Sequence, residues 1–282
     1  MIPAAFAYAR ATSVEDAVAK LAAAQGAGKI LAGGHSLIPV MKMRLAEPAT
    51  LIDIGRIAAL VGVREEGGRI HVGACTVHNH IASAPAVQQH APALSDAASQ
   101  IGDAQVRNRG TIGGSIAHAD PAADYPAVML ALDADIHVQG PGGARQVKAG
   151  AFFKDLLTVD LAADEIVTAV SFPAARASAY AKLHQRASHY ALVGVAAALD
   201  VRDGVIQGAR IGVTGAGPFA TRLSAVEKAL AGKSASAGSI ASAAQSAGVD
   251  DVTADLHASA EYRRAMIPVF ARRALGAALA RL

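Results

Sequence analysis

The sequence contains a single cysteine, Cys75, among its 282 residues. Iron–sulfur clusters are usually held by several cysteine thiolates, and structural zinc ions by several cysteines or histidines. The chain can therefore hold neither kind of site by itself, and it can form no internal disulfide. His78 and His80 have no third histidine or carboxylate near them in the sequence. We expect a polar turn before a short helix at this point, and no metal site.

Aromatic side chains are also scarce: they make up 4% of the residues, and tryptophan is absent. The formal net charge is only +3, with lysine and arginine spread along the chain. A nucleic-acid-binding surface needs a basic stripe and aromatic side chains for stacking, so no nucleic-acid partner is predicted. The basic residues near the C-terminus are expected to form the solvated face of a last helix; they are Arg263, Arg264, Arg272 and Arg273.

Long apolar runs are missing as well. Hydrophobic residues make up 52% of the chain, but alanine supplies much of that share. No stretch reaches the roughly 18 uninterrupted apolar residues that a membrane helix needs. The N-terminal residues show no basic segment ahead of an apolar one, so a secretory signal is not expected. We therefore expect a cytoplasmic protein without integral membrane contact.

The first 55 residues predict a small parallel β/α unit. Ser13 and Asp16 form a pattern like a capping box, and the apolar residues that follow fall on one helical face. Glycines end this helix before a short apolar strand that runs into Gly33 and Gly34. The expected elements are a helix from Ser13, strands at 29–32 and 50–54, and a second helix capped by Ser36 that runs to Leu45.

The rest of the chain predicts an α+β fold with mostly antiparallel sheets. Between about 56 and 173 we expect strands at 69–73, 134–138 and 165–172, helices at 76–83, 92–101 and 122–132, and a hairpin turn at 140–143. Beyond this, strands at 190–201 and 205–213 are joined by Arg202-Asp203-Gly204, a tight-turn sequence. Helices are expected near 220–231, 236–247 and 261–280.

Two Gly-Gly segments indicate the chemistry: Ala32-Gly33-Gly34-His35-Ser36 and Thr111-Ile112-Gly113-Gly114-Ser115. A diphosphate is bound well by backbone N–H groups at close range, and glycine permits both the approach and the positive φ angles that make these groups converge. The first segment lies between a strand and a helix, so the helix N-terminus adds a partial positive charge. Side chains of His35, Ser36, Thr111 and Ser115 can donate further hydrogen bonds. The pair of segments predicts an extended diphosphate ligand.

Better-known phosphate motifs are absent from the sequence. No Gly-x-Gly-x-x-Gly follows a strand, and Gly232-Lys233-Ser234 lacks the upstream glycine of a P-loop because Glu227 stands there. A dinucleotide fold of the usual doubly wound kind and a P-loop are both disfavoured.

Four segments, in order and spread over nearly the whole chain, resemble a known family. They are Ala32–Pro39, Arg109–Ser115, Ala119–Pro126 and Ser188–Val195. The first two are similar to the flavin signatures of the FAD-binding subunits of molybdenum hydroxylases. These are the medium subunits of carbon monoxide dehydrogenase-type enzymes, related to the flavin domain of xanthine dehydrogenase.

The resemblance implies a division into two domains. Residues 1–175 would form a vanillyl-alcohol-oxidase (PCMH)-type FAD-binding domain, with subdomains at about 1–55 and 56–175 and FAD between them. Residues 176–282 would form a C-terminal domain like that of carbon monoxide dehydrogenase flavoproteins, an antiparallel sheet with packed helices.

The resemblance also implies roles for individual residues. Asp124 would meet the ribose or adenine end of FAD, and Lys182 and Tyr190 would approach the isoalloxazine, with Tyr190 covering the ring. Asp120 is expected both near the cofactor and as a cap of the helix at 122–132. The full expected set is Leu31, Ala32, Gly33, Gly34, His35, Ser36, Leu37, Ile38, Gly110, Thr111, Ile112, Gly113, Gly114, Ser115, His118, Asp120, Asp124, Ile166, Val167, Lys182 and Tyr190.

Two positions depart from the family pattern. Relatives often carry Asp or Asn where this chain has Ser115, which leaves one ribose or phosphate contact open. Xanthine dehydrogenases have a lysine where this chain has His184, which leaves the polar contact to the flavin ring open.

The function implied by the resemblance is electron transfer. Electrons from 2Fe–2S clusters on a small partner subunit would reach FAD here and pass to an external acceptor, while substrate would react on a large molybdopterin subunit. The assembly would be a heterotrimer or a dimer of heterotrimers, and this chain would need no catalytic side chain of its own. The substrate and the electron acceptor stay open.

Two other hypotheses remain. A self-sufficient flavin oxidase of the vanillyl-alcohol-oxidase superfamily would carry FAD linked to His35. A non-enzymatic assembly protein would have lost its flavin, although both Gly-Gly segments are intact.

Overall fold

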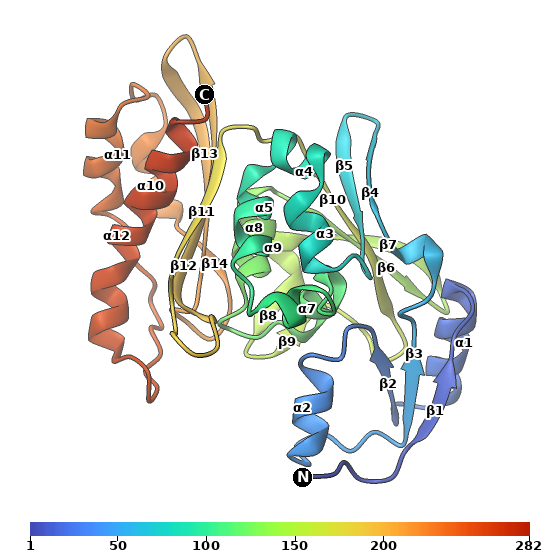
Figure 1. Ribbon diagram of the computed structural model, residues 1–282. Coiled ribbons are helices and arrows are strands. Elements are labelled where there is room, and N and C mark those ends of the chain that lie inside the picture. Colours follow the sequence, from blue (N-terminus) through green and yellow to red (C-terminus); the bar gives the residue numbers. More distant parts are fainter.

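The computed structural model describes residues 1–282, which begin with a small parallel sheet. Its strands β1 (Ala7–Arg10), β3 (Thr50–Asp53) and β2 (Gly28–Leu31) lie side by side in that order. Helices α1 (Val14–Ala23) and α2 (Leu37–Lys42) connect them (Figure 1). The predicted parallel unit is confirmed, and β1 is an additional edge strand whose short, exposed sequence carries little pattern.

Of the two helix caps predicted for this unit, the one at Ser13 is present and the one at Ser36 is absent. The Ser13 hydroxyl accepts from the backbone N–H of Asp16 at 3.1 Å, and the Asp16 carboxylate accepts from the backbone N–H of Thr12 at 2.9 Å. The first bond is the N-cap bond of a capping box, whereas the returning bond comes from Thr12, one residue before the cap, in place of Ser13. Ser36 precedes α2 but makes no side-chain capping bond, so the prediction that it caps this helix is wrong. Its hydroxyl group instead lies at the cavity near the Tyr190 phenol, where it opposes the rise in the pKa of Tyr190 that burial causes.

A five-stranded antiparallel sheet forms the centre of the molecule. Its strands follow the order β4 (Val63–Glu66), β5 (Arg69–Gly73), β10 (Ile166–Pro173), β6 (Asp135–Gly140) and β7 (Gly143–Lys148). The predicted hairpin at 140–143 joins β6 to β7. The remaining elements of this region are η1 (Ala58–Leu60), α3 (His78–Ser83), α4 (Pro85–His90), α5 (Pro92–Ser99), α6 (Ala104–Arg107), α7 (Ile112–His118), α8 (Asp124–Ala131), α9 (Ala149–Phe152), β8 (Phe153–Asp155) and β9 (Thr158–Val159).

The C-terminal region is a four-stranded antiparallel sheet with three helices. The strand order is β11 (Ser178–His184), β12 (Ala191–Arg202), β13 (Val205–Thr214) and β14 (Thr221–Arg222), and the helices are α10 (Ser224–Leu230), α11 (Ala237–Ala244) and α12 (Ala260–Leu279). The long predicted hairpin is β12–β13. The helix expected from 220 begins only at Ser224, because Thr221 and Arg222 pair with β13.

Helix α8 lies between the two antiparallel sheets. All of its residues are buried, from Asp124 to Ala131. Along β12, Val193 and Val195 face the core that contains α12, whereas Ala196 and Ala198 belong to the core that contains α8. The C-terminal sheet is therefore covered on both faces. Its own helices α10, α11 and α12 lie on one side, and the central domain, residues 56–175 with the five-stranded sheet and α8, lies on the other (Figure 1).

The basic face predicted for the last helix is only partly present. Arg264, Arg272 and Arg273 are exposed, but Arg263 is 3% exposed. Its guanidinium donates to the carbonyl oxygens of Leu192, at 2.8 Å, and Gly215, and to Asp255 at 2.6 Å. The prediction is wrong for Arg263 because it lies one turn before the buried Ile267, on the face of α12 that packs on the sheet.

None of the helices combines the length and the apolar character that spanning a membrane requires. No group of three or more histidine, cysteine, aspartate or glutamate side chains is placed to hold a metal ion.

The single cysteine lies in the core of the parallel unit. Cys75 is 5% exposed, its Sγ lies 3.7 Å from the carbonyl oxygen of Ile54, and burial raises the pKa of its thiol to about 12. Because the thiolate is the reactive form, we expect no reaction of the native protein with a thiol reagent at neutral pH and one reactive thiol after unfolding in urea. Rapid labelling of the native protein would contradict this prediction.

Candidate functional site

A cavity of about 720 Å³ lies where the parallel unit meets the central domain. Both Gly-Gly segments line it. Further parts of the wall come from β2, the end of α7 with Asp120, the segment from Leu157 to Val167, and Ser188 to Tyr190 before β12. The two segments predicted to share one ligand thus meet at one site.

The first Gly-Gly segment packs against the backbone of Arg109 and Gly110, which lead directly into the second segment. A Cβ atom on Gly33 would collide with the carbonyl oxygen of Arg109 and lie 2.8 Å from the Cα of Gly110. Gly34 has a φ of +74°, in the left-handed region that favours glycine. The close approach therefore depends on the missing side chain at Gly33 and the conformational freedom of Gly34.

The second Gly-Gly segment forms the first turn of α7. The Thr111 hydroxyl accepts from the backbone N–H of Gly114 at 3.2 Å, as an N-cap. A Cβ on Gly113 would lie 2.5 Å from that of Ala74, so the glycine lets α7 sit directly on the chain after β5. No helix is predicted at 112–118 from the sequence. Threonine is a favoured N-cap residue, so Thr111 is the signal that could have identified the start of this helix.

His78 forms part of the cavity wall beneath the second segment, a position that sequence reasoning missed. It begins α3, is 4% exposed, and its Nδ1 lies 2.9 Å from the hydroxyl group of Tyr125. The expectation of a polar turn is therefore wrong for His78, although His80 is exposed. Burial, with smaller contributions from the charges of His35 and Arg107, lowers the pKa of His78 to about 4.

This lowered pKa predicts an acid-sensitive fold. The unfolded chain takes up a proton on His78 near its ordinary pKa of 6.5, whereas the folded chain does so only near 4. The free energy of unfolding should therefore fall by about 3 kcal/mol as the pH decreases through this window. Urea unfolding of the wild type and of His78→Gln across this range measures the loss, which the variant should lack. The matched control His80→Gln, at an exposed position, should keep the wild-type pH dependence.

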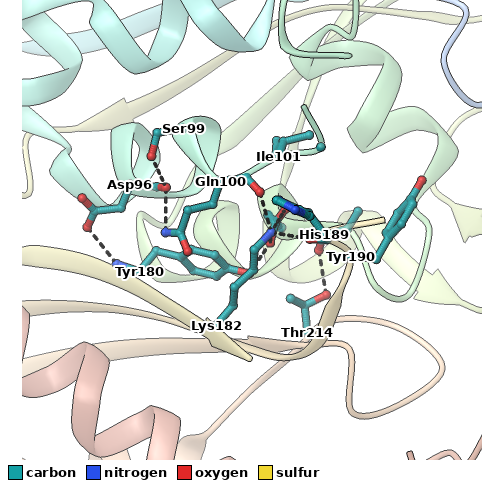
Figure 2. A network of polar contacts seen from close by, with 12 residues as sticks. Asp96, Ser99, Gln100, Ile101, Tyr180, Lys182, His189, Tyr190 and Thr214 are labelled. Carbon is teal, nitrogen blue, oxygen red and sulfur yellow. Dashed lines mark hydrogen bonds and ion pairs between the residues drawn. The ribbon is translucent and has the colours of Figure 1, made fainter. Parts of the chain in front are cut away.

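A buried ion pair joins Asp124, which lines the cavity, to Lys182, which is labelled in Figure 2. Asp124 begins α8, and its carboxylate accepts from the Tyr180 hydroxyl at 2.5 Å and from Lys182 Nζ at 3.0 Å. Burial raises the pKa of Asp124, and the Lys182 ammonium opposes this rise. Asp124 lines the cavity, but its carboxylate has these internal partners. Lys182 does not line the cavity, so its ammonium group does not reach the space in which a flavin ring would lie.

Asp120 and Tyr190 lie together at the cavity wall. The carboxylate of Asp120 accepts from the backbone N–H of Ala122 at 2.8 Å. The N-cap of α8 is Ala123, so the prediction that Asp120 caps this helix is wrong. Tyr190 is 42% exposed; burial of its hydroxyl end raises its pKa, and the charge of Asp120 acts in the same direction.

The structure brings most of the expected cofactor residues to the cavity. The expected residues that do line it are Leu31, Ala32, Gly33, Gly34, His35, Ser36, Leu37, Gly110, Thr111, Gly113, Gly114, Ser115, His118, Asp120, Asp124, Ile166, Val167 and Tyr190. Ile38, Ile112 and Lys182 do not. Ile112 is fully buried in the core of the central domain, on the face of α7 turned away from the cavity.

One wall was missed by sequence reasoning: the segment from Leu157 to Ala163, just before β10. It carries no motif, and it is held by Arg145 of β7. The Arg145 guanidinium donates to the carbonyl oxygen of Asp160 at 2.9 Å and to the Glu165 carboxylate at 2.6 Å. Only the folded chain brings Arg145 to this segment.

The polar and apolar groups that line the cavity are of the kinds that FAD binding requires. The first Gly-Gly segment has backbone N–H groups without partners inside the chain, and it meets the backbone at Gly110, just before the second segment, whose Thr111 and Ser115 carry hydroxyl groups. A diphosphate would lie between the two segments. Apolar side chains such as Leu31, Ile166 and Val167 suit the flat ring systems on either side.

Comparisons with known proteins agree with this geometry. A family model described as the FAD binding domain in molybdopterin dehydrogenase matches residues 4–175. A second model, the carbon monoxide dehydrogenase flavoprotein C-terminal domain, matches residues 178–278. Fold and site therefore define a flavoprotein of the oxidoreductase class. The chain belongs to the family of FAD-binding medium subunits of molybdenum hydroxylases of the carbon monoxide dehydrogenase type.

Individual relatives match over nearly their full length. The carbon monoxide dehydrogenase medium chain of Hydrogenophaga pseudoflava is 40% identical, over 100% of this chain and 99% of the relative. The nicotine 6-hydroxylase medium subunit of Paenarthrobacter nicotinovorans is 39% identical, over 97% of each. Among solved structures, carbon monoxide dehydrogenase from Hydrogenophaga pseudoflava matches with a TM-score of 0.95 at 42% identity, covering 100% of this chain and 99% of that chain. Quinoline 2-oxidoreductase from Pseudomonas putida 86 matches with a TM-score of 0.92 at 31% identity, covering 99% of each.

Proposed function

We propose that this chain takes electrons from 2Fe–2S clusters of a partner subunit onto FAD and passes them to an external acceptor. The observation that carries the proposal is that both Gly-Gly segments line one cavity, with Gly33 packed against the backbone that leads into the second segment. When bound, FAD supplies the redox chemistry. The only thiol of the chain is buried and held protonated, so the iron–sulfur clusters would belong to another chain.

The residues of the cavity have separate tasks in this proposal. Ala32 to Ser36 hold the diphosphate through backbone N–H groups and the Ser36 hydroxyl group, and the segment from Thr111 to Ser115 holds it through the hydroxyl groups of Thr111 and Ser115. Ile166 and Val167 give an apolar wall, and Tyr190 covers the ring at the mouth. Asp120 and His118 lie near enough to contact the cofactor, and none of these side chains needs to act as a nucleophile or general base.

The partners in this proposal are a small 2Fe–2S subunit and a large molybdopterin subunit, as a heterotrimer or its dimer. Support comes from the relatives, which are medium chains or subunits of dehydrogenases and hydroxylases. The relatives include a nicotine hydroxylase and a glyceraldehyde dehydrogenase, so the substrate varies within the family. The matched ranges also support a division into a FAD-binding domain at 1–175 and a C-terminal domain at 176–282.

Purification of the tagged chain from its native host tests the proposal. We expect it to bring down an iron–sulfur protein and a molybdopterin protein, and to release FAD on acid precipitation. Substrate-driven bleaching of the flavin colour should require both partner chains. A chain that purifies alone and keeps its flavin in the acid pellet would support the oxidase with FAD linked to His35. A colourless chain that no added FAD stabilises would contradict both readings.

A further inference from the structure

The ammonium group of Lys182 has three acceptors from three separate parts of the chain (Figure 2). Its side chain is 1% exposed. Nζ donates to the carbonyl oxygen of Gln100 at 2.9 Å, to the Asp124 carboxylate at 3.0 Å and to the carbonyl oxygen of His189 at 2.7 Å. An ammonium has three N–H groups, so every donor is used. A buried charge is tolerated only with such partners, and all three acceptors are therefore held in place.

The counter-ion of Lys182 is itself fixed. Asp124 begins the fully buried helix α8 and also accepts from the Tyr180 hydroxyl. Tyr180 in turn donates its backbone N–H to Asp96 of α5 at 3.1 Å, and its hydroxyl group lies where a side chain on Gly194 would stand. The Lys182 ammonium group is thus paired with a carboxylate that is itself held in place by buried neighbours.

The third acceptor of Lys182, the carbonyl oxygen of His189, belongs to a residue that lines the cavity. The carbonyl group of His189 and the N–H of Tyr190 form one peptide unit, and the N–H donates to the Ser188 hydroxyl at 3.3 Å. His189 has a φ of +62°, a left-handed conformation that is costly for a residue with a side chain. Lys182 and Ser188 hold the two polar groups of this peptide, and the next side chain, Tyr190, lines the cavity.

We infer that Lys182 is a positioning residue for Tyr190. Its charge, anchored by Asp124, keeps the His189–Tyr190 peptide in its strained conformation and so places the tyrosine ring at the cavity mouth. Lys182 acts on the flavin through Tyr190 and not by contact. The inference rests on the proposed function, in which the flavin ring lies against Tyr190.

Flavin fluorescence tests the inference, because an adjacent tyrosine ring quenches it. We compare fluorescence per bound FAD in the purified complex for the wild type, Lys182→Met and Tyr190→Ala. Methionine keeps the apolar stem of the lysine without its charge. Loss of a hydrogen bond to a charged group should raise the population with a displaced ring by about tenfold, so the fluorescence of Lys182→Met should rise above the wild type toward that of Tyr190→Ala. The double variant should equal Tyr190→Ala alone, and Lys228→Met, at an exposed position, should match the wild type.

If Lys182→Met does not fold, a second variant, Ser188→Ala, tests the inference. Ser188→Ala removes the bond on the other side of the same peptide, at an exposed position, and should raise the fluorescence by a smaller amount. Wild-type fluorescence in a folded Lys182→Met variant, or in Ser188→Ala when Lys182→Met does not fold, would overturn the inference. Additive effects in the double variant would overturn it too. A wild type that binds no FAD would instead show that the proposed function is wrong, and the inference would fall with it.

Discussion

Replacement of Gly33 by alanine is expected to weaken FAD binding by about a hundredfold, since a forced backbone shift costs up to about 3 kcal/mol. The added Cβ would meet the carbonyl oxygen of Arg109 and the Cα of Gly110, both backbone atoms that cannot rotate away. The two Gly-Gly segments would have to separate, and the N–H groups of the first and the hydroxyl groups of the second would no longer converge on one diphosphate. Titration of the deflavinated protein with FAD, followed by flavin fluorescence, measures the affinity.

The matched control is Gly142→Ala in the hairpin between β6 and β7. A Cβ at Gly142 would meet nothing within 4 Å, so FAD affinity should stay at the wild-type level. The thermal midpoint without FAD shows whether Gly33→Ala still folds. A folded Gly33→Ala variant with wild-type affinity would rule out the idea that contact between the two segments builds the site.

Replacement of Arg263 by methionine is expected to lower the free energy of unfolding by about 3 kcal/mol, because it leaves buried carbonyl groups without donors. These are the carbonyl groups of Leu192, at the start of β12, and of Gly215, just after β13. Methionine retains the apolar stem, so the measured loss reports the polar contacts. Urea unfolding followed by circular dichroism gives the free energy.

The neighbouring arginine provides the control. Arg264 is exposed on the same helix, and Arg264→Met should change the free energy of unfolding by no more than about 0.5 kcal/mol. Equal effects of the two variants would mean that the buried guanidinium contributes no more than a surface charge.

The sequence was most informative where the chemistry is local. Gly33, Gly34, Gly113 and Gly114 carry conformational and steric requirements that can be recognised within a few residues, and the structure brings their segments to one cavity. The Ser13 capping box is local in the same sense. Features of this kind are visible in sequence because the partner atoms lie nearby along the chain.

Features that depend on distant partners could not be predicted. In β11, polar residues alternate from Ser178 through Tyr180 and Lys182, a pattern that suggests a solvated face. That face instead packs on α5 and α8, where Asp96 and Asp124 supply its partners. The wall from Leu157 to Ala163 is likewise placed by Arg145 of a different strand. Both arrangements arise from contacts between segments far apart in sequence.

The position of α8 bears on whether the two matched domains are independent folding units. Its residues are apolar around nearly the whole helix, and Ala127 touches Gly212 of the C-terminal sheet so closely that no side chain could be added there. A fragment ending at residue 175 would expose this surface to water, so we expect it to aggregate. Unfolding of the whole chain should then be one cooperative transition, and exchange of the C-terminal domain between relatives should succeed only when α8 is exchanged with it.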